Sequence, residues 1–304
     1  MFKEIRKYSY GEKELLNIPE RPGRSHKGTF GRLLVIGGCR GMSGAPYFSA
    51  YAAYRSGVGL VEIYSDEANR AVLQALIPEA IVTCYSPASL NIGALHEAIK
   101  RCDAISVGMG LGRSEAARTI LATVLQEARV PTVIDADALN LIAQDGELFR
   151  LMCERRDGTA GVIVTPHFGE MSRLCEASVS DIAKDTVHIA KDFADKTGVV
   201  CLLKDRNTVI CEPGCDDIFI NTSGCSGLAT AGSGDVLAGV IGAMCAYGVP
   251  PAEAARLGAY VHGLAGEVAS ERLSEYSVTA RDIIDALPAV FRRIEALRAR
   301  KDTL

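Results

Sequence analysis

The chain has 304 residues, and 48% of them are hydrophobic, so it can bury a large core as one domain or as two smaller ones. Its net charge of −4 comes without a long basic tract, which gives no electrostatic reason to expect nucleic acid or an anionic membrane as a partner. The ten cysteines form no CxxC pair and lie mostly in apolar stretches, as is typical of reduced thiols rather than of a zinc site. The first residues are too charged for a signal peptide, and no uncharged run reaches the roughly twenty residues of a membrane span, so we expect a cytoplasmic protein.

The order of apolar and polar segments predicts an N-terminal arm followed by one domain. Residues 1–20 are mostly polar, and Pro19 and Pro22 break any long element, so we expect an arm over the body and a single domain at 21–304. Short apolar runs predict strands at 32–37, 59–64, 103–108, 130–135, 161–165 and 199–203, and then a hairpin at 209–211 and 218–220. Helices are expected after Pro46, at 114–128 with Ser114 as the cap, from Ala138, and at 236–247, 252–270 and 278–297. This alternation predicts an α/β fold in which a mostly parallel sheet is covered by helices on both faces.

The turns that follow the strands are expected to share one edge of the sheet with the stretch 221–235, because parallel strands end on the same side. These turns are residues 37–44, 108–112, 135–140, 165–170 and 204–208. The turn 108–112 lacks the full GxGxxG spacing and a matching acid, so it predicts either a close approach of a ligand or only a tight turn. Among Asp135, Asp137 and Asn140, we expect one side chain to cap the following helix and another to line the crevice.

Three residues of the later turns are candidates for a binding site. His167 lies directly beyond a buried strand, where a histidine is either structural or in contact with a ligand. Glu170 either supports the dipole of the helix that begins there or holds magnesium through water beside a nucleotide. Lys204 ends another strand and is either solvated or, next to an anion site, a cationic partner for phosphate.

The stretch 221–235, NTSGCSGLATAGSGD, leads into a helix of small residues. Its glycines permit sharp turns, and the first amides of the following helix lack internal partners and attract anions. By itself such a loop is more often a packing device, and it lacks the lysine of a P-loop. Asp235 would be a helix N-cap at a plain helix start, or a general base beside a phosphate.

Five segments in the same order make the chain resemble the ADP-dependent (S)-NAD(P)H-hydrate dehydratases, which also occur as the C-terminal domain of bifunctional NAD(P)H-hydrate repair enzymes. The segments are 25–38 (SHKGTFGRLLVIGG), 43–46 (SGAP), 135–140 (DADALN), 165–171 (TPHFGEM) and 229–237 (ATAGSGDVL). The resemblance covers nearly the whole chain and implies the three-layer αβα ribokinase-like fold. It also implies the dehydration of (S)-NADHX or NADPHX to NADH or NADPH, with ADP or ATP as co-substrate and Mg²⁺ as cofactor. In that reaction the substrate hydroxyl is phosphorylated and phosphate is eliminated, which leaves AMP when ADP is used.

The resemblance implies roles for individual residues as well. Asp235 matches the base near the substrate hydroxyl, and the matched substrate-binding positions are Ala45, Gly110, His167 and Asp235. The matched nucleotide-binding positions are Lys204, Asp205, Arg206, Asn207, Thr208, Gly232, Ser233 and Gly234. Glu170 falls where ribokinase-like enzymes often place an acid that helps to position magnesium. Members of the family commonly form homo-oligomers, which implies an oligomer such as a tetramer.

Two residues depart from the pattern of the family. Its members usually have glycine where this chain has Asp205, and commonly asparagine where it has Cys225. A carboxylate beside phosphates is unfavourable unless it points away or meets a cation such as Arg206, so the preference between ADP and ATP is open.

Two other functions are open as well. One is a ribokinase-like kinase for a small alcohol such as a vitamin precursor, and the other is a nucleotide-binding sensor without catalysis.

Overall fold

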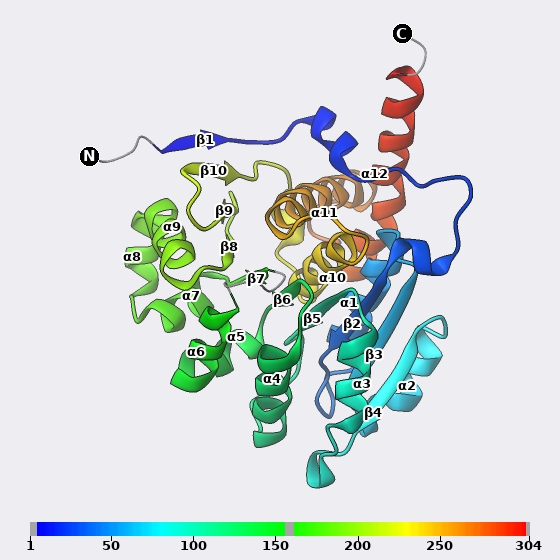
Figure 1. Cartoon of the computed structure of the whole chain (residues 1–304). Coiled ribbons are helices and arrows are strands. Elements are labelled where there is room, and N and C mark those ends of the chain that lie inside the picture. The colour runs from blue at the N-terminus through cyan, green and yellow to red at the C-terminus, as the bar shows by residue number, and fades with distance from the viewer. Residues whose placement is uncertain (1–4, 156–160, 302–304) are drawn as a thin grey trace.

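The computed structural model describes residues 5–155 and 161–301, and it has helices on both faces of a central sheet (Figure 1). In this described part ten strands form one sheet in the order β1-β10-β9-β8-β7-β6-β5-β2-β3-β4. Only β9 runs antiparallel to its neighbours among these strands, so the predicted mostly parallel sheet is confirmed. The strands are β1 (Arg6–Tyr8), β2 (Arg32–Ile36), β3 (Leu60–Asp66), β4 (Ile81–Tyr85), β5 (Ala104–Val107), β6 (Thr132–Ile134), β7 (Val162–Val164), β8 (Val200–Leu203), β9 (Val209–Cys211) and β10 (Asp217–Ile220).

The helices divide between two hydrophobic cores, one on each face of the sheet. One core receives side chains from α1 (Gly44–Arg55), α2 (Arg70–Leu76), α10 (Ser233–Ala246), α11 (Pro251–Leu273) and α12 (Ala280–Lys301). The other receives them from α3 (Gly93–Arg101), α4 (Glu115–Glu127), α5 (Asp137–Gln144), α6 (Gly146–Glu154), α7 (Phe168–Cys175), α8 (Val179–Lys184) and α9 (Thr186–Thr197). Short 3₁₀ turns lie at Glu12–Asn17, Lys27–Phe30, Glu67–Asn69, Pro87–Ser89 and Ser226–Leu228. The three-layer architecture is therefore confirmed.

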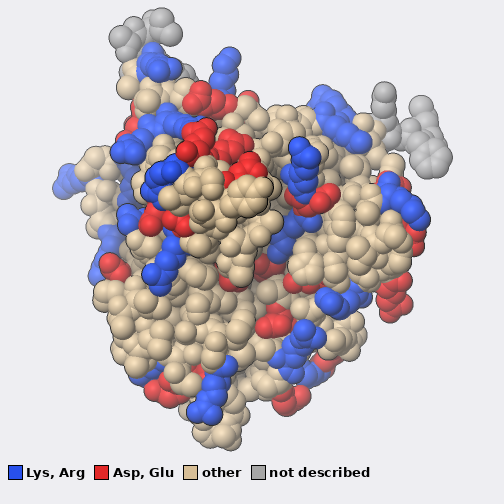
Figure 2. All heavy atoms as spheres, turned by 180° about the vertical axis from the view of Figure 1, so that it is seen from behind, with Lys and Arg blue, Asp and Glu red and all other residues tan. Residues whose placement is uncertain are grey.

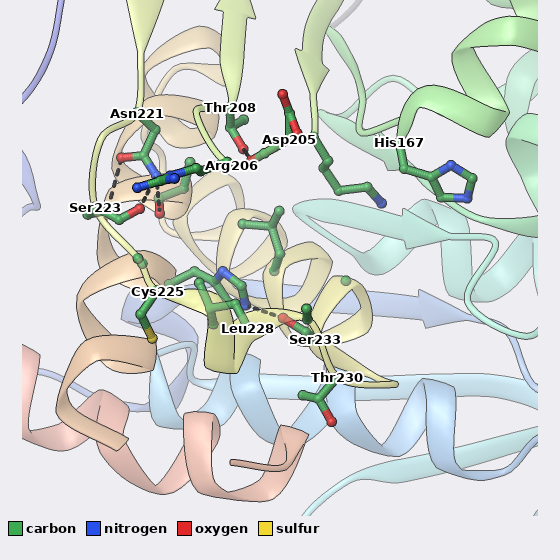
Figure 3. Close-up of a pocket in the computed structure, with 18 of the residues that line it drawn as sticks. His167, Asp205, Arg206, Thr208, Asn221, Ser223, Cys225, Leu228, Thr230 and Ser233 are labelled. Atoms are coloured by element: carbon green, nitrogen blue, oxygen red, sulfur yellow. Dashed lines mark hydrogen bonds between the residues drawn. The ribbon is translucent and has the colours of Figure 1, made fainter. Parts of the chain in front are cut away.

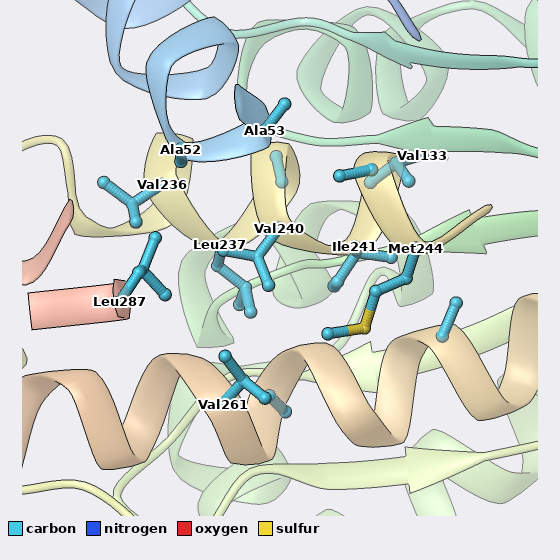
Figure 4. Close-up of a cluster of buried hydrophobic side chains, with 14 of the residues drawn as sticks. Ala52, Ala53, Val133, Val236, Leu237, Val240, Ile241, Met244, Val261 and Leu287 are labelled. Atoms are coloured by element: carbon cyan, nitrogen blue, oxygen red, sulfur yellow. The ribbon is translucent and has the colours of Figure 1, made fainter. Parts of the chain in front are cut away.

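Helix α10 lies inside the first core, between α1 and α11 (Figure 4). Nearly all of its residues are buried, because its sequence is apolar or small on every side. Gly239 permits the close approach of α1, since a Cβ built there would lie 2.1 Å from the carbonyl oxygen of Ser49. Val236, Val240 and Met244 fill the space around the helix (Figure 4). This packing holds the N-terminus of α10 in a fixed position at the edge of the sheet.

The N-terminal arm is part of the fold rather than only a cover over it. Residues 1–4 lie outside the described residues, but β1 pairs with β10 and so extends the sheet. The hydroxyl of Tyr10 donates to Glu253 of α11 at 2.5 Å, and the side chain of Leu15 is fully buried. Residues 5–20 therefore pack against the domain that follows them.

The structure has α2, β4 and α3 within residues 67–102, where no element was expected. Strand β4 forms one edge of the sheet, and its first four residues are exposed or half-buried. Its sequence IVTCY is rich in β-branched residues and carries a strand signal that the prediction did not use. Basic and acidic side chains are mixed over the face of the molecule in Figure 2. Among the described residues, no helix has the length and apolar character that a bilayer crossing needs. All ten cysteines are free thiols.

Candidate active site

A pocket of about 1080 Å³ opens where β6, β7 and β8 end, beside the N-terminus of α10 (Figure 3). The turns after these strands line it with Asp135, His167, Glu170 and Lys204, and residues 223–235 close the other side together with α11. The expected common edge is therefore confirmed for the turns after β6, β7 and β8. It brings together side chains that are far apart in the sequence.

Two residues with an expected role lie next to this pocket but do not line it. The turns after β2 and β5 meet where the strand order reverses, because the amide of Cys39 donates to the carbonyl oxygen of Gly110 at 2.6 Å. Gly110 has a φ of 60°, and a Cβ built there would lie 3.1 Å from the Cβ of Ala45 at the start of α1. Ala45 and Gly110 thus lie against each other at the point where open α/β sheets form ligand crevices.

The ammonium group of Lys204 occupies the centre of the site. Its Nζ lies 2.8 Å from Oδ1 of Asp135 and 4.0 Å from Oε2 of Glu170. A Cβ built on Gly234 would lie 3.5 Å from this Nζ, so the ammonium group reaches the first turn of α10. Burial by itself would lower the pKa of Lys204, but the carboxylates of Asp135, Glu170 and Asp235 outweigh it and raise that pKa. A charged lysine and the free amides of a helix N-terminus therefore lie side by side, which favours an anion.

Asp235 is the third residue of α10 and is partly buried in the pocket. The helix begins at Ser233 after Gly232, whose φ of 90° requires glycine, so the expected start at Val236 was three residues late. The N-cap is Gly232, and the interpretation of Asp235 as an N-cap is wrong. Burial and the nearby charge of Asp135 raise the pKa of Asp235 to about 7, although Lys204 acts in the opposite direction. A carboxyl group with this pKa suits a general base at neutral pH.

His167 and Glu170 cap helix α7 and line the pocket as well. The Nδ1 atom of His167 accepts from the amides of Gly169 at 2.9 Å and Glu170 at 3.2 Å, and Oε2 of Glu170 accepts from the amide of His167 at 3.0 Å. The predicted place of Glu170 in the first turn of a helix is confirmed. Burial raises the pKa of Glu170 to about 7 and lowers that of His167, with Lys204 nearby opposing the first shift and adding to the second.

The acidic turn after β6 differs from its prediction in one respect. Asp135 lines the pocket, which confirms the prediction that one of Asp135, Asp137 and Asn140 does so. No side chain caps α5, because its N-cap is Ala136, so the predicted capping is wrong. Asp137 instead accepts from the amide of Gly112 at 2.9 Å, and Asn140 donates to the carbonyl oxygen of Ala136 at 3.1 Å. These contacts tie the turns after β5 and β6 together.

The turn after β8 contributes an exposed wall of the pocket. Asp205, Arg206 and Thr208 line it, whereas Asn207 is exposed and does not. The hydroxyl of Thr208 donates to the carbonyl oxygen of Asp205 at 3.2 Å. Arg206 extends toward Asn221, and not toward Asp205 (Figure 3). The carboxylate of Asp205 is thus not covered by the neighbouring guanidinium group.

Helix α11 supplies pocket residues that were not predicted to be functional. His262 was expected to be packed among small residues, and it is buried, but its Nε2 lies 3.2 Å from the hydroxyl of Ser233. The thiol of Cys225, which lies in the stretch 221–235, is 3.0 Å from the hydroxyl of Ser270 on α11. A polar imidazole between small residues of an otherwise buried helix was the available signal. Asn221, Ser223 and Leu228, within the predicted stretch 221–235, and Ala259 and Glu275, outside it, also line the pocket without having been assigned a role.

Comparison with known proteins identifies the family of the chain. A family model described as NAD(P)H-hydrate dehydratase matches residues 33–289. The chain is 39% identical to the ADP-dependent (S)-NAD(P)H-hydrate dehydratase of Neisseria meningitidis serogroup B, over 81% of this chain and 80% of that protein. It is 37% identical to the bifunctional NAD(P)H-hydrate repair enzyme of Moorella thermoacetica, over 91% of this chain, and spans about half of that relative, 52% of its length.

A solved structure shows the same architecture. The ADP/ATP-dependent NAD(P)H-hydrate dehydratase of Bacillus subtilis, co-crystallised with ATP and Mg²⁺, superimposes with a TM-score of 0.79 at 29% identity, over 93% of this chain and 97% of that one. The relatives and the solved structure each cover most of the chain, and the family model spans the turns that build the pocket. The chain therefore belongs to the NAD(P)H-hydrate dehydratase family and has its ribokinase-like fold.

Proposed function

We propose that this protein dehydrates (S)-NADHX or NADPHX to NADH or NADPH, with ADP or ATP as the phosphoryl donor. The observation that carries the proposal is the meeting of Asp235, Lys204 and the first amides of α10 in one pocket. These groups are what phosphoryl transfer to a hydroxyl needs, namely a base and fixed positive charge. The names of the Neisseria and Bacillus relatives support the substrate and the nucleotide.

The reaction begins with the hydroxyl group of the hydrated nicotinamide ring. Asp235 accepts the proton of this hydroxyl while its oxygen attacks the terminal phosphoryl group of the nucleotide, which releases AMP from ADP or ADP from ATP. The amides of Gly234 and Asp235, together with the ammonium of Lys204, stabilise the charge on the transferred group. Phosphate then leaves with a proton from the adjacent ring carbon, and the reduced nicotinamide ring is restored.

The remaining matched positions divide between the two ligands. Ala45 and Gly110 at the crevice, with His167 and Asp235 in the pocket, would surround the hydrated nicotinamide. The turn 204–208 and residues 232–234 would hold the nucleotide. The exposed Asp205 on this turn places a negative charge near the phosphates, which favours the donor with fewer charges. We therefore expect ADP to bind more tightly than ATP.

Magnesium would come to this site with the nucleotide. Among residues 5–155 and 161–301, no three His, Cys, Asp or Glu side chains form a group that could hold a metal ion. Mg²⁺ keeps most of its water and usually takes one or two carboxylates in addition to nucleotide phosphates, so a single acid suffices. Glu170 is buried, with Oε2 4.0 Å from Nζ of Lys204, and fits this role through water. The ion would neutralise phosphate charge.

The test is recovery of NADH absorbance when the protein is incubated with hydrated NADH, Mg²⁺ and either ADP or ATP. We expect NADH, inorganic phosphate and the shortened nucleotide to appear in equal amounts. A phosphorylated product that accumulates would instead indicate a kinase, and tight nucleotide binding without turnover would indicate a sensor. No recovery of NADH with either nucleotide, from folded protein, would refute the proposed dehydration.

A further inference from the structure

His262 and Ser233 form a buried pair in the pocket, at the N-terminus of α10. The Nε2 atom of His262 on α11 lies 3.2 Å from the hydroxyl oxygen of Ser233, the first residue of α10 (dashed line at Ser233 in Figure 3). Both residues line the pocket, and their exposed fractions are only 8% and 7%. The contact joins two helices at the point where the anion-binding amides are presented.

The backbone of Ser233 does not serve the anion site, so its hydroxyl is the group that it offers. The amide of Ser233 donates to the carbonyl oxygen of Thr230 at 3.3 Å, within the turn that leads into α10. The amides of Gly234 and Asp235 come next in the first turn, where a helix leaves its amides without partners. Ser233 lines the same pocket as Gly234 and Asp235, so its hydroxyl can add a third donor to these amides.

The imidazole of His262 is suited to orient this hydroxyl. Burial, reinforced by the charge of Lys204, lowers the pKa of His262 to about 4, although the contact with Ser233 opposes this, so the ring is neutral in the physiological range. A neutral imidazole has one donor nitrogen and one acceptor nitrogen. When Nε2 carries the hydrogen and donates to the oxygen of Ser233, the hydroxyl hydrogen is not used by the ring and can be donated to a group bound in the pocket.

We propose that His262 is a positioning residue for phosphoryl transfer, which holds the hydroxyl of Ser233 as a hydrogen-bond donor to the transferred phosphoryl group. The inference rests on the proposed function, since it assigns to the pocket a phosphoryl group in transfer. Neutral imidazole adds orientation without adding charge next to Lys204. The donor strengthens as charge builds on the phosphoryl oxygens, so its effect on kcat exceeds its effect on nucleotide affinity.

The test compares His262→Gln with His262→Leu in the whole chain, each with and without Ser233→Ala. Glutamine places an amide donor near the position of Nε2, whereas leucine has a similar volume and no donor. We expect His262→Leu to lower kcat about tenfold and to weaken ADP binding about threefold, the size of effect that one hydrogen bond produces. His262→Gln should stay within about threefold of the wild type in kcat. In the Ser233→Ala background, His262→Leu should have no further effect.

Two results would overturn the inference. One is an equal loss of kcat in the glutamine and leucine variants, which would indicate a packing role. The other is the same factor of loss from His262→Leu whether or not Ser233 has its hydroxyl. Thermal melts of each variant establish that it is folded. Turnover by the wild type decides the proposed function separately, and if it is absent the coupling between the two residues is measured on ADP affinity by calorimetry.

Discussion

Replacement of Asp235 by asparagine tests the base and its environment together. Asparagine keeps the shape of the side chain and removes its capacity to accept a proton, so kcat should fall by about two to four orders of magnitude. The amides of α10 and the ammonium of Lys204 remain, and the Kd for ADP should therefore change by less than about threefold. Steady-state recovery of NADH and titration calorimetry measure the two effects.

The same substitution should stabilise the protein at alkaline pH. The pKa of Asp235 is raised from its ordinary value of 3.8 to about 7, so ionisation of this carboxyl opposes folding. The free energy of unfolding that depends on this carboxyl is therefore highest below about pH 4, where the group is protonated in both states. It is lost as the pH rises through about 7. Three pKa units correspond to about 4 kcal/mol, and solvent screening of a partly exposed group reduces this to on the order of 2 kcal/mol. Denaturant unfolding should show this gain for Asp235→Asn at about pH 8 and a smaller gain at about pH 5.

Asp192→Asn is the matched control. Asp192 lies on the exposed side of α9, with its carboxylate 4.0 Å from Nζ of Lys196, and it does not line the pocket. Its substitution should change kcat by less than about twofold and the free energy of unfolding by less than about 0.5 kcal/mol. Unchanged turnover in Asp235→Asn would remove Asp235 from the mechanism. Lost turnover without a gain in stability at alkaline pH would show that the carboxyl is not held in an unfavourable environment.

Three further predictions concern the charges of the pocket. In the wild type, kcat/KM should rise with pH through about 7, because Asp235 must lose its proton to act as the base and burial raises its pKa to about 7. A flat profile between about pH 5 and pH 8 would contradict this role. Lys204→Met should weaken ADP binding at least about tenfold and destabilise the fold by about 3 kcal/mol, because Asp135, 2.8 Å from Nζ, then lies buried without its cation. Calorimetry measures the first effect and thermal melts the second. An unchanged melting temperature would contradict a stabilising role for the Lys204–Asp135 pair. Asp205→Gly should tighten ADP binding about threefold at low salt and less at about 0.5 M salt, because it removes a repulsive charge. Equal affinities in calorimetry would show that Asp205 does not face the phosphates.

Local patterns along the chain were enough to predict most of the central strands and one helix cap. Buried apolar runs marked β2, β3 and β5 to β8, because strands covered on both faces have few polar residues. Ser114 was identified as the cap of α4, and it accepts from the amide of Ala117. The edge strand β4 was missed, although its β-branched run IVTCY is a strand signal. The five ordered segments indicated the family, which the comparisons then showed.

The interactions between these residues depend on the tertiary structure. The contact between Lys204 and Asp135 spans 69 positions of the chain, and it exists because β6 and β8 end at the same edge of the sheet. The raised pKa of Asp235 depends on burial and on that same carboxylate, neither of which its neighbours in sequence reveal. The pairing of His262 with Ser233 likewise depends on the packing of α11 against α10. Contacts and burial act through space, so a pattern along the chain can mark a candidate residue but not its partner.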